Sequence, residues 1–162
     1  MSVEGHRFYP GDTATPPQLL QLADEYRRAA EALLPTGRRR APLSRAPYRL
    51  VAIQAIELYL NAFLLDAGHA PCSLRGLQHD LAKRTRLALD ASLVLRKRTI
   101  DHLESLSRTR EYLVTRYDPT QPTASQLNRL AATLSELSDK VNSRIKRRPP
   151  DAARVAACSA TV

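Results

Sequence analysis

The sequence has no tryptophan, only five glycines and two cysteines, and aromatic residues make up 5% of its 162 positions. A β-sandwich or barrel needs many turn glycines and β-branched or aromatic strand residues, so this composition argues against both. Two cysteines, Cys72 and Cys158, are too few for a disulfide framework or a zinc knuckle. No apolar run approaches the roughly 20 residues of a membrane span, and positions 1–10 carry no signal-like apolar stretch. We therefore expect a protein of the reducing cytoplasm with no membrane partner.

What the chain does contain favours helix and positive charge. Hydrophobic residues make up 43% of the chain, with alanine and leucine, two strong helix formers, dominant. Lysine and arginine number 25 against 16 acidic residues, giving a net charge of +9, and only four of these cations are lysine. Arginine binds phosphate well because its planar fork donates two parallel hydrogen bonds. The excess therefore indicates either a phosphate-binding surface or simply a solvated basic one.

The first helix has clear boundary signals. Thr15 is placed to be its N-cap, with Pro16 at the first helical position and Gln18 completing a capping box. Pro35-Thr36-Gly37 ends it. Apolar residues recur at helical spacing at Leu19, Leu22, Tyr26, Ala29 and Leu33. This spacing predicts that the face they form packs on the core.

Similar patterns predict the remaining elements. A basic linker over 38–49 leads into a very apolar helix over 47–67, and a loop over 68–78 precedes a short helix over 79–90. A long helix is expected over 93–117, and a last one follows a second capping box, Thr123 to Gln126. The fold class expected is an all-α, up-and-down helical bundle of four long helices plus one short helix over 15–146. Residues 1–14 are expected to be a flexible N-terminus and 147–162 a disordered tail of basic and small residues.

Polar residues interrupt two of the apolar stripes. Arg110 stands where a leucine is expected between Leu106 and Leu113, and Glu57 stands likewise between Ile53 and Leu60. A lone buried charge is costly, whereas two opposite charges can satisfy each other. We therefore predict that Glu57 and Arg110 face one another across the bundle or line one groove. The pair is either structural or part of a groove that binds phosphate or a partner.

Three segments in this order resemble the HEPN (higher eukaryotes and prokaryotes nucleotide-binding) family. Residues 57–64, Glu-Leu-Tyr-Leu-Asn-Ala-Phe-Leu, are similar to its second-helix signature, in which lysine is frequent where this chain has Asn61. His79-Asp80-Leu81 resembles the His-Asp-Leu that follows the family's Gly/Pro loop. Arg116-Tyr117-Asp118-Pro119 resembles its late-helix segment ending in Arg-Tyr-Pro. The resemblance covers residues 15–146.

The resemblance implies a helical bundle, frequent dimerisation, and RNA or nucleotide partners. Many family members are metal-independent ribonucleases that use an arginine followed four to six residues later by a histidine, which can move protons near neutral pH. No histidine follows Arg108 or Arg110 at that distance. We therefore expect a non-catalytic module. The expected phosphate or ligand contacts are Arg110, Arg116, Glu57, Asn61, His79 and Asp80, and the weak catalytic candidates are Arg110, Arg116 and Tyr117.

Other candidates for chemistry are weaker. No histidine pair has the His-x-x-x-His spacing of a metal site, so we expect no metal and no cofactor. His102 is expected to be solvated on a charged side of its helix, and His79 to hydrogen-bond locally near a helix start. Three basic clusters, over 38–49, 83–98 and 144–148, can track a nucleic-acid backbone if they converge, although no aromatic residues alternate with them.

Three functions remain open. The first is a HEPN-like module that dimerises and binds RNA, a nucleotide or a partner protein through a groove containing Arg110 and Glu57. The others are a metal-independent ribonuclease of toxin or defence type, and a ligand-free helical adaptor. The resemblance also permits a nucleotidyltransferase-type partner protein. A homodimer is expected because large apolar side chains lie around several sides of the helix over 47–67, namely Tyr48, Leu58, Tyr59 and Phe63. One bundle interior is not expected to bury all of them, so a second subunit is expected to cover one face.

Overall fold

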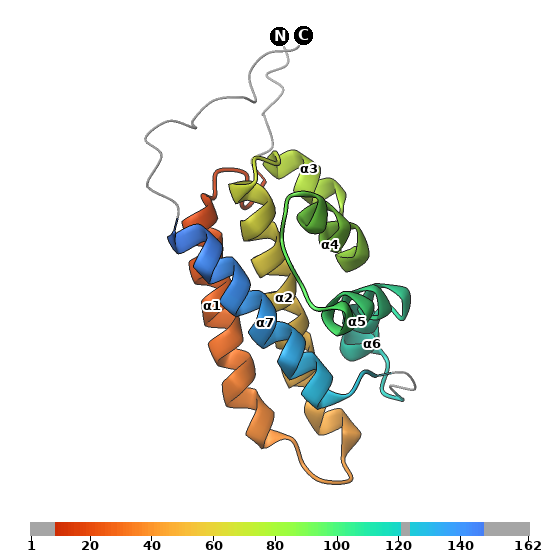
Figure 1. The fold of residues 1–162 in the computed structure, drawn as a ribbon. Coiled ribbons are helices and arrows are strands. Elements are labelled where there is room, and N and C mark those ends of the chain that lie inside the picture. The colour runs from red at the N-terminus through yellow and green to blue at the C-terminus, as the bar shows by residue number, and fades with distance from the viewer. Residues whose placement is uncertain (1–8, 121–123, 148–162) are drawn as a thin grey trace, which may run out of the picture.

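The computed structural model describes residues 9–120 and 124–147, and all regular elements within these ranges are helical (Figure 1). The predicted all-α class is confirmed. The helices are α1 (Pro16–Leu33), α2 (Ala46–Asp66), α3 (Pro71–Gly76), α4 (Leu81–Asp90), α5 (Lys97–Arg108), α6 (Glu111–Tyr117) and α7 (Leu127–Lys146). Two 3-10 turns, Leu34–Thr36 and Pro42–Arg45, connect α1 to α2. The expectations for residues 1–8, for Thr123 of the second capping box and for the tail after residue 147 lie outside the described residues.

Helix α2 is the centre of the bundle, packed against α1, α4, α6 and α7 (Figure 1). Its 21 residues include 13 buried ones, so it is apolar all round, as a core helix should be. By length and composition alone, Pro42–Asp66 resembles a membrane span, with a mean hydropathy of 1.3, but it is mostly buried inside the protein. Tyr48, Leu58, Tyr59 and Phe63 are each at most 8% exposed. These side chains therefore do not form the dimer surface expected of them, because one chain buries all four.

Helix α1 starts as predicted but turns a different face to the core. Thr15 Oγ1 accepts a hydrogen bond from the Gln18 amide at 3.4 Å, and Gln18 Oε1 accepts one from the Thr15 amide at 2.9 Å, which confirms the capping box. The buried residues are Leu20, Ala23 and Ala30. Of the stripe predicted to face inward, Leu22 is 44% exposed and Tyr26 is 37% exposed. Leu19 and Leu33 pack against the core as predicted, whereas the middle of the predicted face points outward, because a neighbouring apolar stripe has the same spacing.

The helix predicted over 93–117 is divided between α5 and α6. Arg110 lies between them in the left-handed backbone region, with a φ of 52°. The amides of Thr109 and Arg110 donate to the carbonyls of Ser105 and Ser107, which closes the end of α5. This break redirects the chain so that α6 packs against both α2 and α5. Another helix missed by sequence, α3, is a short one within the loop predicted over 68–78.

Candidate functional site

A buried polar cluster forms around Glu57 of α2. Glu57 is 9% exposed, and its Oε2 lies 3.0 Å from His79 Nδ1 while its Oε1 lies 3.4 Å from Arg84 Nη2. The predicted pairing of Glu57 with Arg110 is therefore wrong. Because the chain breaks at Arg110, this arginine leaves the inward stripe and is exposed to solvent. His79 also makes a long-range contact rather than the local one expected.

Arg84 of α4 is the centre of this cluster. It is 2% exposed, and its Nε donates to Asn61 Oδ1 at 2.7 Å. Its guanidinium also donates to three backbone carbonyls at 3.3–3.4 Å, those of Leu74, Leu77 and Asp80. Burial lowers the pKa of Arg84, which the negative charge of Glu57 opposes. The guanidinium remains charged, and it ties the segment before α4 to α2.

Asp80 begins α4 and links it to α5. Its Oδ1 accepts from the Lys83 amide and from Ser107 Oγ, both at 3.0 Å. Ser107 Oγ in turn accepts from the Ala82 amide at 3.1 Å. Burial acts to raise the pKa of Asp80, but these hydrogen bonds favour the charged form and the net effect is a lowered pKa. Asp80 is thus the N-cap of α4, with its Oδ1 already engaged by two donors.

Four of the predicted site residues, Glu57, Asn61, His79 and Asp80, therefore lie together around one arginine. Sequence reasoning missed Arg84, although it lies on the same face as Leu81 and Ala88, the buried residues of α4. The ring of His79, whose side chain is 41% exposed, rests against Tyr112 with the ring centroids 4.8 Å apart. This cluster pins α2, α4, α5 and α6 together, and its hydrogen bonds are made within the protein.

The three remaining predicted residues do not join this cluster. Arg110 and Arg116 are exposed, and Tyr117 is 75% exposed at the end of α6. The buried charge at this position is instead the adjacent Glu111, which is 1% exposed. Its Oε1 pairs with Arg49 Nη1 at 2.9 Å, and its carboxylate also accepts from the amide and hydroxyl of Ser125, both at 3.0 Å. An inward ion pair therefore exists, one residue away from the prediction.

His102 is buried, which corrects the expectation that it is solvated. It is 6% exposed, and its Nδ1 lies 2.8 Å from Thr133 Oγ1 of α7. Its Nε2 is buried with no hydrogen-bond partner among the described residues. Burial, together with the positive charges of Arg129 and Arg49, lowers the pKa of His102 to about 4. The imidazole is therefore neutral at physiological pH and is part of the packing between α5 and α7.

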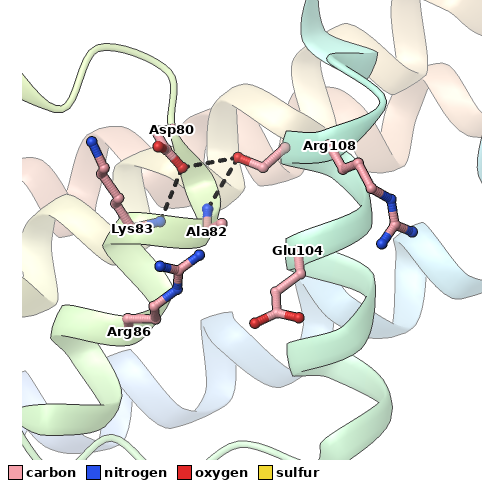
Figure 2. A pocket seen from close by; sticks show the side chains of 7 residues that line it. Asp80, Ala82, Lys83, Arg86, Glu104 and Arg108 are labelled. Carbon is pink, nitrogen blue, oxygen red and sulfur yellow. Dashed lines mark hydrogen bonds between the residues drawn. The ribbon is translucent and has the colours of Figure 1, made fainter.

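A pocket of about 420 Å³ opens between α4 and α5 (Figure 2). Lys83 and Arg86 border it from α4, and Glu104 and Arg108 border it from α5. The hydrogen-bonded pair of Asp80 and Ser107 also lines it. Because the carboxylates of Asp80 and Glu104 line it together with three cations, this pocket has mixed charge.

A second pocket, the arginine pocket, has a single sign of charge. Its volume is about 370 Å³, and it lies where the connection after α1 enters α2. Five arginines dominate the lining, namely Arg38, Arg39, Arg40, Arg45 and Arg49. The other lining residues are Ala41, Pro42, Ala124 and Leu127. No acidic side chain is in this lining, as far as the structure describes the chain. These arginines belong to the basic segment that the sequence places over 38–49.

Local structure fixes the arginine pocket. The Arg38 amide donates to Ser44 Oγ at 2.7 Å, and the Ala41 amide donates to the Arg38 carbonyl at 3.3 Å, which closes a turn. Arg45 crosses above Gly37 and donates to the Leu34 carbonyl at 3.2 Å. A Cβ on Gly37 would overlap with the Arg45 side chain, so only glycine leaves this arginine its place.

Metal chemistry has no candidate in residues 9–120 and 124–147, where no group of three His, Cys, Asp or Glu side chains is placed to hold an ion. Comparisons with family models, with curated proteins and with solved structures found no match to this chain. The resemblance to HEPN domains therefore stays a prediction from the motifs.

Proposed function

We propose that this chain is a non-catalytic helical module whose arginine pocket binds the phosphate groups of RNA. One observation carries the proposal: five arginines from a single short segment line one pocket with no acidic residue in the described lining. Guanidinium groups keep their proton at any physiological pH and bind phosphate oxygens in a bidentate manner. The motif resemblance implies RNA or a nucleotide as the partner, and both carry phosphate groups.

This proposal replaces the predicted groove of Glu57 and Arg110. Glu57 is bonded to His79 and Arg84, and Arg110 is exposed to solvent, so the predicted pair does not form. The residues lining the arginine pocket are arginine, alanine, proline and leucine. None of these has a side chain that can accept a proton near neutral pH, so the pocket can bind but has no general base.

The pocket also predicts how RNA is recognised. No aromatic side chain is in its described lining, so bases have no surface to stack on. Binding by phosphate contacts alone gives little sequence preference and an affinity that falls steeply with salt. We therefore expect RNAs of equal length and different sequence to bind with similar affinity.

The test is fluorescence anisotropy with a labelled single-stranded RNA across a range of salt concentrations. The variant Arg38→Ala/Arg39→Ala should bind more weakly. Its log–log salt dependence should be shallower by roughly 0.7 for each phosphate that the variant no longer neutralises. The matched control is Arg86→Ala/Arg108→Ala, which removes the same charge from exposed positions of the α4–α5 pocket. The control should retain most of the wild-type affinity.

The same experiment separates the other functions. An equal decrease in affinity in both variants would show that net charge, and not the arginine pocket, binds RNA. Absence of salt-sensitive binding would leave the ligand-free adaptor. Metal-independent cleavage of the RNA, followed on a gel, would indicate the ribonuclease and contradict a non-catalytic module. A DNA strand of the same sequence that binds as tightly would show that the pocket does not select RNA.

A further inference from the structure

The arginine pocket holds more positive charge than the carboxylates in the described part of the chain neutralise. Arg49 is paired with the buried Glu111 behind the pocket. The other four arginines are Arg38, Arg39, Arg40 and Arg45. Within the part of the chain that the structure describes, none of them forms an ion pair with a carboxylate. Four like charges around one pocket repel one another, and an anionic ligand bound among them would reduce this repulsion.

The backbone of this segment is also strained in a way that places a charge at the pocket. Arg40 has a φ of 59°, a left-handed conformation that glycine adopts easily and other residues adopt at a cost of about 1 kcal/mol or more. An arginine therefore occupies a position where glycine would be more stable. This turn places the Arg40 side chain in the lining of the pocket.

The shape of the pocket distinguishes between phosphate ligands. A backbone phosphodiester carries one negative charge, and successive phosphates along a strand are separate groups, which suits arginines spread along a surface. Here the arginines surround one volume of about 370 Å³, within the range of small-ligand sites. Four positive charges that pair with no carboxylate among the described residues match a group that concentrates several negative charges.

We infer that the arginine pocket binds a compact, multiply charged phosphate group, such as the triphosphate at an RNA 5′ end or on a free nucleotide. This inference rests on the proposed function and specifies which part of the ligand the pocket holds. The several terminal oxygens of such a group give each guanidinium an acceptor pair. The bases of the ligand lie outside the pocket and contribute little selectivity.

The test compares two RNAs of identical sequence, one with a 5′-triphosphate and one with a 5′-hydroxyl, by anisotropy at a single salt concentration. Wild-type protein should prefer the triphosphate RNA by about tenfold or more, the equivalent of one charge-assisted hydrogen bond. Arg40→Gly should abolish this preference, and since it relieves the left-handed backbone it should not lower the melting temperature. Arg110→Gly is the matched control, because Arg110 is also left-handed, with a φ of 52°, but does not line the pocket.

Competition separates the sources of the phosphate group. Inorganic tripolyphosphate should displace the triphosphate RNA from wild-type protein, and failure to displace it would overturn the inference. A free nucleoside triphosphate that competes only as well as tripolyphosphate indicates that the phosphates alone are recognised, as inferred, whereas much stronger competition would overturn the claim that the bases lie outside. Equal affinity for the two RNAs would overturn the inference and leave the proposed function standing. Binding of neither RNA would overturn both.

Discussion

Acidification from pH 7.5 to pH 5.0 should destabilise the protein by about 2 kcal/mol through His102 alone. In the folded protein the pKa of this buried imidazole is lowered to about 4, whereas its ordinary value is 6.5. A histidine with a lowered pKa contributes stability that is fully present above pH 6.5. That stability is lost as the pH falls from 6.5 toward 4, because the unfolded chain takes up the proton first.

The magnitude follows from the pH interval. Between pH 6.5 and pH 5.0, His102 is protonated in the unfolded state but stays neutral in the folded state. This difference in protonation extends over about 1.5 pH units. At about 1.4 kcal/mol per unit, the folded state loses about 2 kcal/mol relative to the unfolded state. Asp80, whose pKa is lowered, stays ionised at pH 5.0 and does not add to this loss.

The assay is urea unfolding followed by far-ultraviolet circular dichroism at both pH values, since the chain has no tryptophan for fluorescence. In His102→Gln the side chain cannot titrate, so this variant should lose about 2 kcal/mol less than wild type over the interval. His69→Gln, in the loop after α2, is the control and should follow wild type. An equal loss in wild type and His102→Gln would refute the reasoning, because the titrating group would then lie elsewhere.

Three further substitutions test other parts of the structure. Arg84→Met leaves the buried carboxylate of Glu57 without this cation and should lower the free energy of unfolding by about 3 kcal/mol. The control Arg86→Met, on the exposed side of the same helix, should lower it by under about 0.5 kcal/mol. Urea titration measures both values. Gly37→Ala should displace Arg45 and weaken RNA binding in the anisotropy assay, with a near-normal melting temperature. Tyr59→Phe removes the buried hydroxyl's bond to a carboxylate and should lower the melting temperature by an amount equivalent to about 1–2 kcal/mol.

The elements that the sequence predicts well have local signals. The capping box fixes the start of α1, and the run of apolar residues identifies α2, whose observed bounds of Ala46–Asp66 differ by one residue at each end from the expected 47–67. The face of α1 could not be predicted in this way. The exposed Leu22 and Tyr26 belong to an apolar stripe that adjoins the buried stripe of Leu20 and Ala23, so only packing against α2 and α7 decides which residues are buried.

The site shows the same division. Glu57 was predicted to face inward, and it does, because its place among α2 core residues is a periodic signal. Its true partner, Arg84, lies on a short helix after an irregular loop, so no spacing rule connects the two. The helix break at Arg110 has no glycine or proline that would predict it from the sequence. Because of the break, the charged residue that points inward is Glu111, one position after the predicted Arg110. The homodimer stays a prediction, without the surface first expected for it.

If the arginine pocket binds phosphate as proposed, Glu111 is an internal competitor for that ligand, because it already neutralises Arg49. Its carboxylate occupies Arg49, one of five arginines in the lining, and it is held in place by Ser125 at the entry to α7. On this proposal, an external phosphate would meet a pocket whose positive charge Glu111 has already reduced. Removing the Glu111 carboxylate would then strengthen phosphate binding by releasing Arg49, while it would also cost the structure a buried ion pair.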